Sequence, residues 1–424
     1  MNTEERLSSK QTVENAFMGT ANRQTKLALL TNIIAPYRIP LFSFLADQFD
    51  LLILHGGEEA NRDSWNNLEE ALSKAKVVRA WGWQLRLAKK VNGEVFDEKF
   101  IHMTPGLAWH LLRFRPDAVI SNEMGFRSVV ALAYGALFRK PAWIWWEGTL
   151  HSERNVNLLR RLIRKAFVFS VDHWISFGET STEHLLHLGV KRDRILQLQN
   201  AVDEEPFKTP AEPAWAIQPR PVVLYVGQLI ERKGVKLLLD AAAKVQQNGS
   251  EFSLLLVGSG RDKQALQDRA DVLGLRNMHF LPVQPPERMP AVYRSADLMV
   301  LPTLEDVWGL VANEAILSGI PVLCSKYAGC AGELFAPKHL FAPDDSHEFC
   351  QKLEAAISSG LSKADPARLK TTQQLGGELV QHLRRWLPPA LIRERNESGV
   401  SSDSTRQSPH PGTDETRQPA ENIQ

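Results

Sequence analysis

Short apolar segments alternate with longer amphipathic segments along most of this sequence, and the alternation occurs in two series. The first series runs from a predicted strand at 26–31 to another at 195–198, and the second runs from a strand at 222–226 to a helix at 348–358. Strands that alternate with helices form a parallel sheet covered by helices on both faces. The sequence therefore predicts an α/β protein with two Rossmann-like, doubly wound domains.

The length of the chain also favours two domains, because 424 residues exceed what one ordinary hydrophobic core contains. A proline-rich polar stretch between the two series is typical of a linker. Both ends of the chain are polar, and they bury too little apolar area to offset the entropy of ordering. In chain order, we expect a disordered N-terminus (1–24), a first domain (25–205), a linker (206–220), a second domain (221–375), a helical segment (376–396, with a helix at 379–395) and a disordered tail (397–424).

Composition and charge narrow the range of partners and locations. The formal net charge is +1, which gives no reason to expect nucleic-acid binding. Three cysteines without metal-binding spacing, together with an N-terminus that lacks an apolar signal segment, predict a cytoplasmic protein. No apolar run is long enough to cross a bilayer, because the nearest, at 128–146, is interrupted by Arg139, Lys140 and Pro141.

A basic amphipathic helix is predicted at 158–169. Arg160, Arg161, Arg164 and Lys165 alternate there with leucines and other apolar residues. This pattern suits a helix that lies peripherally on an anionic membrane surface, from the cytoplasmic side. The alternative is an ordinary domain helix whose apolar side packs on the sheet.

Two carboxylates, Asp306 and Glu314, follow the strongly apolar strand predicted at 298–301. Asp306 stands in the turn after this strand, and Glu314 lies about two turns into the next helix. A buried carboxylate normally has a partner, and sugar hydroxyls are suitable donors. We expect Glu314 to bind a ribose and Asp306 to bind a transferred sugar, with Glu305 as an alternative for the second role.

The start of this helix is suited to a diphosphate, because helix N-termini present free backbone N–H groups and a partial positive charge. The amides of Gly309, Leu310 and Val311 are the expected donors. Together with the two carboxylates, they predict a nucleotide-sugar site.

Two further loops follow strands in the second series. Gly227 permits a tight turn after 222–226, and the nearby Gln228, Arg232 and Lys233 can face a diphosphate. The alternative is a polar loop without a ligand.

Gly258 opens the loop after the next strand, beside the same expected ligand. A full dinucleotide fingerprint would require another glycine where Lys263 stands, so that motif is incomplete. A plain turn is nearly as good an interpretation of Gly258.

In the first series, Glu147 ends the strand predicted at 142–146. A carboxylate at the carboxyl end of a parallel strand faces the crevice where open sheets bind ligands. His151 is expected to be a surface histidine, and Tyr37 and Arg38 in the first loop are candidates to contact an acceptor. Core packing is the expected role of the neighbouring Trp143, Trp145 and Trp146, with sugar stacking as the alternative.

Four segments of the chain stand out together because of their order. They are Pro36-Tyr37-Arg38-Ile39-Pro40-Leu41-Phe42, Gln199-Asn200-Ala201-Val202-Asp203, Val226-Gly227-Gln228-Leu229 with Lys233-Gly234, and Ala296-Asp297 to Pro302 running into Asp306 and Glu314. In these segments and their order, the chain resembles retaining glycosyltransferase family 4 (glycosyl transferases group 1), a GT-B family, from about Lys26 to Ser358.

The resemblance implies two domains that face each other across a cleft, with the donor site in the second. Glu314 would bind the ribose, Lys233 the diphosphate and Asp306 the sugar, while Glu147 approaches from the first domain. It further implies a metal-independent enzyme without a cofactor. Such an enzyme moves a hexose from a nucleotide-diphosphate donor to a glycan or lipid-linked acceptor, with retention of anomeric configuration, in cell-envelope polysaccharide synthesis.

The sequence departs from the family pattern in three places. Gln228 replaces the usual arginine, Asp306 replaces the commoner glutamate, and the first loop lacks the usual pair of glycines. The loss of a positive charge at Gln228 keeps open a degenerate, non-catalytic module that binds a partner. A nicotinamide-dependent oxidoreductase is the other alternative, and Lys263 argues against it.

Overall fold

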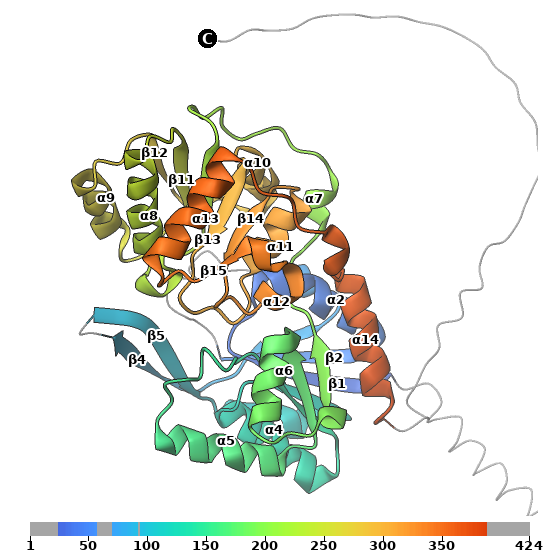
Figure 1. Ribbon diagram of the computed structural model, residues 1–424. Helices are drawn as coiled ribbons and strands as arrows, with labels where there is room; N and C mark the ends of the chain where they lie inside the picture. Colours follow the sequence, from blue (N-terminus) through green and yellow to red (C-terminus); the bar gives the residue numbers. More distant parts are fainter. Residues whose placement is uncertain (1–23, 57–69, 92–93, 388–424) are drawn as a thin grey trace, which may run out of the picture. The chain divides into compact units, whose positions relative to one another are not determined.

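A computed structural model describes residues 24–56, 70–91 and 94–387 of the chain (Figure 1). Two parallel sheets organise these residues, as the alternation predicts, and each sheet with its helices is called a lobe below. The predicted disordered segments at 1–23 and 397–424, and positions 388–396 of the helical segment, lie outside the described residues.

The first lobe is built on a seven-stranded parallel sheet. Its strands, in spatial order, are β3 (Lys76–Arg79), β2 (Asp50–His55), β1 (Lys26–Thr31), β6 (Ala118–Asn122), β7 (Ala142–Trp146), β8 (His173–Phe177) and β9 (Ile195–Leu198). Its helices are η1 (Pro36–Arg38), α2 (Ile39–Gln48), η2 (Glu70–Leu72), α3 (Gly106–Phe114), α4 (Phe126–Phe138), α5 (Leu158–Ser170), α6 (Gly178–His187), η3 (Arg192–Arg194) and the distant α14 (Thr372–Arg384).

Helices cover both faces of this sheet because its strands are apolar on both sides. Successive side chains of a strand point to opposite faces. Leu27 and Leu29 of β1 pack in one cluster with α2 and α14, whereas Ala28 and Leu30 pack in another with α3 and α4.

The second lobe is built on a six-stranded parallel sheet. Its strands, in spatial order, are β12 (Met278–Leu281), β11 (Ser253–Val257), β10 (Val222–Val226), β13 (Leu298–Leu301), β14 (Val322–Ser325) and β15 (Leu340–Phe341). Its helices are α7 (Glu205–Lys208), η4 (Glu231–Lys233), α8 (Val235–Gln247), α9 (Lys263–Val272), η5 (Pro286–Arg288), α10 (Met289–Arg294), α11 (Leu310–Leu317), α12 (Ala331–Leu334), η6 (Pro337–His339), α13 (Ser346–Ser358) and η7 (Pro366–Arg368).

The strand order of the second sheet reverses between β10 and β13. One series of strands runs outward from β10 and the other outward from β13. In open α/β sheets the loops at such a reversal diverge and leave a crevice at the carboxyl ends of the strands. The loops after β10 and β13, which carry Lys233 and Asp306, are therefore at the position where this architecture binds ligands.

Helix α14 returns to the first lobe, which the sequence did not predict. It begins at Thr372, ahead of the helix expected at 379–395, because Thr371 and Gln374 form a capping box. Its apolar residues Leu375, Leu379 and Leu383 lie in the same cluster as β1 and α2.

Strands β3, β4 (Trp83–Val91) and β5 (Glu94–Met103) were also missed. β4 and β5 form an antiparallel hairpin, and β5 contacts η4 of the second lobe. The alternation of apolar and polar residues along 83–91 is the signal that could have revealed it.

Candidate active site

The carboxylate after β13 forms an ion pair with the lysine after β10. Lys233 Nζ donates to Asp306 Oδ2 at 2.5 Å, and the two side chains are only 17% and 11% exposed. Burial alone would raise the pKa of Asp306, but Lys233 and Arg232 outweigh it and hold this pKa below its ordinary value. Asp306 is therefore an anion at neutral pH, held by a cation from the neighbouring loop.

Glu314 lies in α11 and receives a hydrogen bond from a tyrosine that the sequence analysis missed. The Tyr293 hydroxyl donates to Glu314 Oε2 at 2.6 Å and lies 3.3 Å from the Val311 carbonyl. Burial raises the pKa of Glu314 to about 7, although the bond from Tyr293 opposes this shift. Near neutrality the carboxyl group is thus balanced between a neutral form and an anion that accepts further hydrogen bonds.

The start of α11 has the backbone that the sequence predicts. Gly309 precedes the helix with φ 98°, in the left-handed region that favours glycine. A Cβ there would lie 2.9 Å from Leu301. The half-buried Leu310 and Val311 supply N–H groups of the first turn, which have no intrahelical acceptor.

Gly227 and Gly258 are required by the packing of two neighbouring loops. Their φ angles are 149° and 156°, and a Cβ on Gly258 would lie 1.9 Å from the Gly227 carbonyl oxygen. The backbone of Gln228 is fixed by Tyr225, whose hydroxyl donates to its carbonyl at 2.7 Å. Packing therefore accounts for the two glycines themselves, and a ligand beside these loops stays a prediction.

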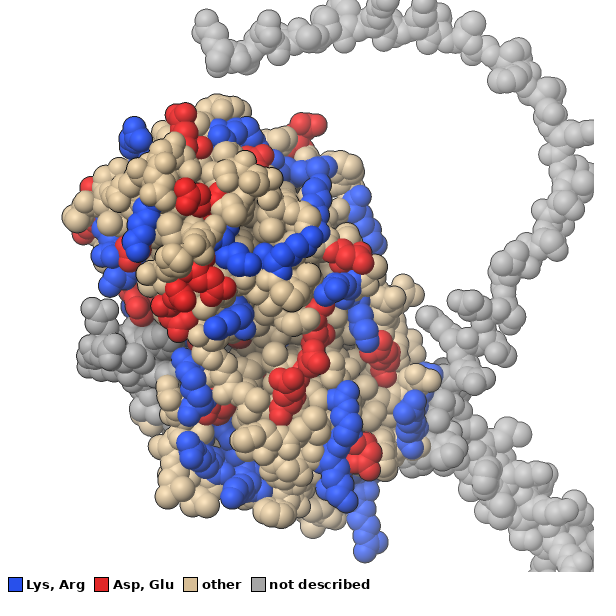
Figure 2. All heavy atoms as spheres, in the orientation of Figure 1, with Lys and Arg blue, Asp and Glu red and all other residues tan. Residues whose placement is uncertain are grey.

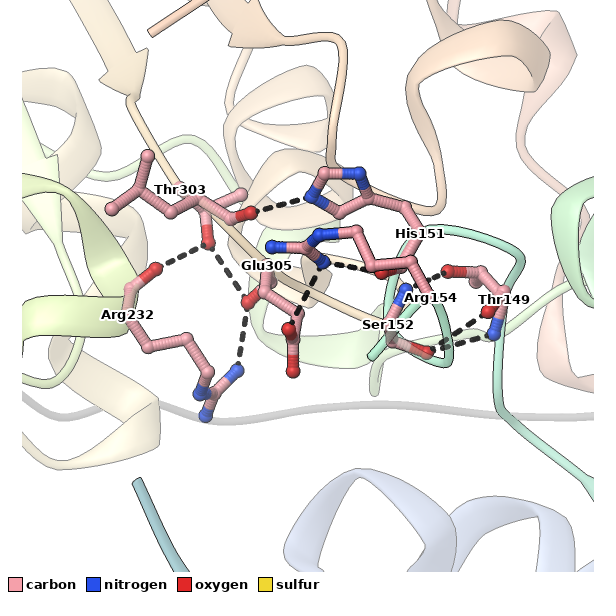
Figure 3. A network of polar contacts seen from close by, with 8 residues as sticks. Thr149, His151, Ser152, Arg154, Arg232, Thr303 and Glu305 are labelled. Carbon is pink, nitrogen blue, oxygen red and sulfur yellow. Dashed lines mark hydrogen bonds and ion pairs between the residues drawn. The ribbon is translucent and has the colours of Figure 1, made fainter. Parts of the chain in front are cut away.

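Glu305, the alternative to Asp306, connects the two lobes (Figure 3). Arg154 of the first lobe donates to its carboxylate at 3.2 Å, and Arg232 donates to its backbone carbonyl at 2.9 Å. Because Glu305 is 6% exposed, its charge is stabilised by this partner from the other lobe. The network fixes the loop that leads directly into Asp306.

His151 belongs to the same network, and its expected role as a surface histidine is wrong. Its Nε2 lies 2.8 Å from the Leu304 carbonyl oxygen, and its ring stacks on Tyr327 with centroids 4.1 Å apart. Partial burial lowers the pKa of this imidazole. No local pattern around His151 indicates its contacts with Leu304 and Tyr327 of the other lobe.

The first lobe places Glu147 against Arg38. The two side chains form an ion pair, and the Arg38 guanidinium lies 4.9 Å from the Phe177 ring centre and 5.5 Å from that of Trp145. Two residues that the sequence singled out separately, one for the donor and one for the acceptor, are thus direct partners. Trp145 is buried beside this ion pair, and Trp143 and Trp146 are buried in other parts of the core. Core packing is therefore the role of all three tryptophans.

A second connection between the lobes was missed by the sequence analysis. Trp308 Nε1 donates to Asn313 Oδ1 at 2.9 Å, and Asn313 Nδ2 donates to the Asn200 carbonyl at 3.0 Å. Trp308 also packs on Gly178, where a Cβ would lie 2.4 Å from its ring. The segment between the two acids is therefore fixed to the first lobe on a second side.

Over the described part of the chain, no three His, Cys, Asp or Glu side chains are grouped in a way that could hold a metal ion. Within those same residues, every helix is too short or too polar to traverse a bilayer.

Comparison with solved structures addresses the arrangement of the two lobes. HepE from Anabaena, in complex with UDP and glucose, matches 86% of this chain and 96% of its own with a TM-score of 0.59 at 18% identity. Sucrose-phosphate synthase from Thermosynechococcus elongatus matches 86% and 95% with a TM-score of 0.58 at 16% identity. The chain has the GT-B fold. At these identities the similarity concerns the fold alone.

A protein-family model matches most of the second lobe. Residues 209–373 match the family model described as "Glycosyl transferases group 1", and this range includes Lys233, Asp306 and Glu314. The D-inositol 3-phosphate glycosyltransferase of Nocardia farcinica is 34% identical over 185 residues, which are 40% of this chain and 41% of that protein. The chain spans less than half the length of the curated relatives it matches.

Proposed function

We propose that this GT-B chain is a glycosyltransferase that moves a hexose from a nucleotide-diphosphate sugar to a glycan or lipid-linked acceptor. The observation that carries the proposal is the match of residues 209–373 to a glycosyltransferase family model, combined with the position of its polar residues. Lys233, Asp306 and the start of α11 lie at the reversal of strand order in that lobe. HepE, which shares the fold, was solved with UDP and glucose, and this supports a nucleotide sugar as donor.

In this proposal the second lobe binds the donor from both ends. Glu314, as an anion, accepts hydrogen bonds from the ribose hydroxyls. The diphosphate lies against the amides of Gly309, Leu310 and Val311, and Lys233 turns from Asp306 towards it. Asp306 then accepts from hydroxyls of the hexose. Gly227, Gln228, Arg232 and Gly258 border the same position.

Catalysis would be mainly positioning and stabilisation of the departing diphosphate, by fixed amides and an ammonium group in place of a metal ion. Attack on the face from which the diphosphate leaves would retain the anomeric configuration, as in glycosyltransferase family 4. Glu147 would complete the site from the first lobe. We place the reaction in cell-envelope polysaccharide synthesis on the cytoplasmic side, by resemblance to that family.

A thermal-shift panel of nucleotide sugars, followed by product analysis with the best donor, tests the proposal. A ligand that binds the native state raises the melting temperature in proportion to the logarithm of its concentration over Kd. Stabilisation by one class of nucleotide sugar, and its loss in Lys233→Ala, is the expected result. A shift without hydrolysis or transfer would support the degenerate binding module, and no shift with any nucleotide sugar would contradict both ideas.

A further inference from the structure

Helix α5 packs on the first lobe with its apolar side facing solvent. Leu158, Leu159, Leu162 and Phe169 are 72%, 67%, 56% and 87% exposed. At 100° per residue these four side chains fall on one side of the helix. The expectation that the apolar side of this helix packs on the sheet is therefore wrong.

The opposite, charged side of α5 fixes this orientation. Arg164 is buried, forms an ion pair with Glu153 and lies 4.6 Å from the centre of the Trp146 ring. Phe167, one turn further, packs beside Trp146 and Trp174. A guanidinium that leaves this position would leave the Glu153 carboxylate without its charge partner, so rotation of the helix to bury its leucines is opposed.

Basic residues border the exposed apolar stripe along one edge. At 100° per residue, the exposed Arg161 and Lys165 lie next to Leu158, whereas the exposed Arg160 lies on the side of Arg164. The helix contains no acidic residue from Leu158 to Ser170. Figure 2 shows Lys and Arg side chains gathered over the position that α5 occupies in Figure 1. Cations next to protruding leucines and a phenylalanine are the combination that binds an anionic lipid surface.

A second exposed apolar site of the first lobe lies at the end of α4. At the end of α4, Leu137 and Phe138 are 73% and 44% exposed, and Arg139 follows them. The second lobe offers no comparable stripe among its described residues, where Val272 and Val283 are isolated.

We infer that α5 is a membrane-docking helix, which lies flat on an anionic bilayer with Leu158, Leu162 and Phe169 among the acyl chains and its basic residues at the lipid phosphates. This inference does not depend on the proposed transferase activity. It places the first lobe against the membrane.

Co-sedimentation of the purified full chain with vesicles tests the inference. The vesicles contain either equal parts of phosphatidylcholine and phosphatidylglycerol or phosphatidylcholine alone. We expect binding to the anionic vesicles only, and its loss at about 0.5 M NaCl, where electrostatic attraction is screened. The variant Leu162→Ser/Phe169→Ser and the variant Arg161→Glu/Lys165→Glu should each bind at least about tenfold more weakly.

The control variant is Val272→Ser/Arg276→Glu, which alters an exposed apolar and an exposed basic residue of the second lobe. It should sediment like the wild type. All variants should keep the wild-type circular dichroism spectrum and nucleotide affinity, since α5 is outside the donor site. Failure of the wild type to bind anionic vesicles would overturn the inference, as would wild-type binding by both α5 variants. Light scattering tests a further alternative, in which a second copy of the chain covers α5. A dimer of the wild type that the Leu162→Ser/Phe169→Ser variant dissociates would also overturn the inference.

Discussion

Lys233 and Asp306 neutralise each other across 2.5 Å at the carboxyl ends of two neighbouring strands of the second sheet. They are distant in sequence, and each lies in a different βα loop. The pair keeps a cation and an anion largely out of solvent at the position where the fold binds ligands. A diphosphate that enters must compete with Asp306 for the ammonium group, which links donor binding to the release of the carboxylate.

Replacement of this lysine should weaken donor binding. We expect Lys233→Ala to raise the Kd of the preferred nucleoside diphosphate by about ten- to a hundredfold, because one charged hydrogen bond to a phosphate is lost. Isothermal titration calorimetry measures the change. Lys236→Ala, an exposed lysine in the following helix, is the matched control and should bind like the wild type. Equal affinities of Lys233→Ala and wild type would remove Lys233 from the phosphate site.

Replacement of its partner should have the opposite signature. Asp306→Asn keeps the shape of the side chain and relieves Lys233 of its counter-charge, so nucleoside diphosphate affinity should be unchanged or higher. Transfer should be lost, because the amide is a poor substitute for a carboxylate acceptor. Calorimetry and a product assay separate the two effects. Glu305→Gln is the comparison: if it abolishes transfer while Asp306→Asn does not, the roles of the two acids are exchanged.

Donor binding should depend on pH through Glu314. Its pKa of about 7 lies above the ordinary glutamate value of 4.5, so the Glu314 carboxyl group of the folded protein still holds its proton below about pH 7. In the proposed site this group binds the ribose as an anion, so the proton must leave when the donor binds. Affinity for a nucleotide sugar, whose diphosphate does not titrate near neutrality, should fall as the pH decreases below about 7. Binding near that pH should release a proton, seen as a dependence of the calorimetric enthalpy on the buffer.

The variant Glu314→Gln should bind more weakly at pH 8 and show no proton release. The linkage also has a sign for folding: between pH 4.5 and about 7 the unfolded chain has lost this proton and the native chain has not, so Glu314 reduces stability as the pH rises. Persistence of the pH dependence in Glu314→Gln would assign it to another group.

The glutamine in the first loop of the second lobe should be a gain-of-affinity position. Gln228 is half-buried, and its backbone is held by Tyr225, so an arginine side chain can extend from an already fixed loop. Gln228→Arg should lower the Kd of the nucleoside diphosphate several-fold, with a steeper dependence on salt. An unchanged Kd at low salt would show that position 228 does not face the phosphates.

Helix α14 should be required for the stability of the first lobe, although it follows the second in sequence. Leu379 is fully buried against β1 and α2, and Leu379→Ala should cost about 2–5 kcal/mol through lost burial and a residual cavity. Gln381→Ala, on the exposed side of the same helix, is the control. A melting temperature for Leu379→Ala equal to that of Gln381→Ala would mean that the helix is only loosely attached.

Local sequence patterns were sufficient for the central strands of the two parallel sheets, whereas the edge strands β3 and β15 were missed. The strands at 26–31, 142–146, 222–226 and 298–301 have their predicted bounds, because buried parallel strands are short, continuous apolar runs. The missed hairpin 83–103 shows the limit of that signal. Its alternating pattern is weaker, and its strand β5 lies against η4 of the second lobe.

What the sequence determined by itself was the layered architecture and the identity of the polar residues at strand ends, since both follow from side chains near one another in the chain. The tertiary structure alone decided which polar side chains pair: Lys233 with Asp306, Tyr293 with Glu314, Arg38 with Glu147, and Arg154 with Glu305. It also decided that α14 crosses back and that α5 presents its leucines to solvent. These outcomes depend on which face of an element finds a complementary surface in a distant segment, and the periodicity of one segment contains no information about its partner.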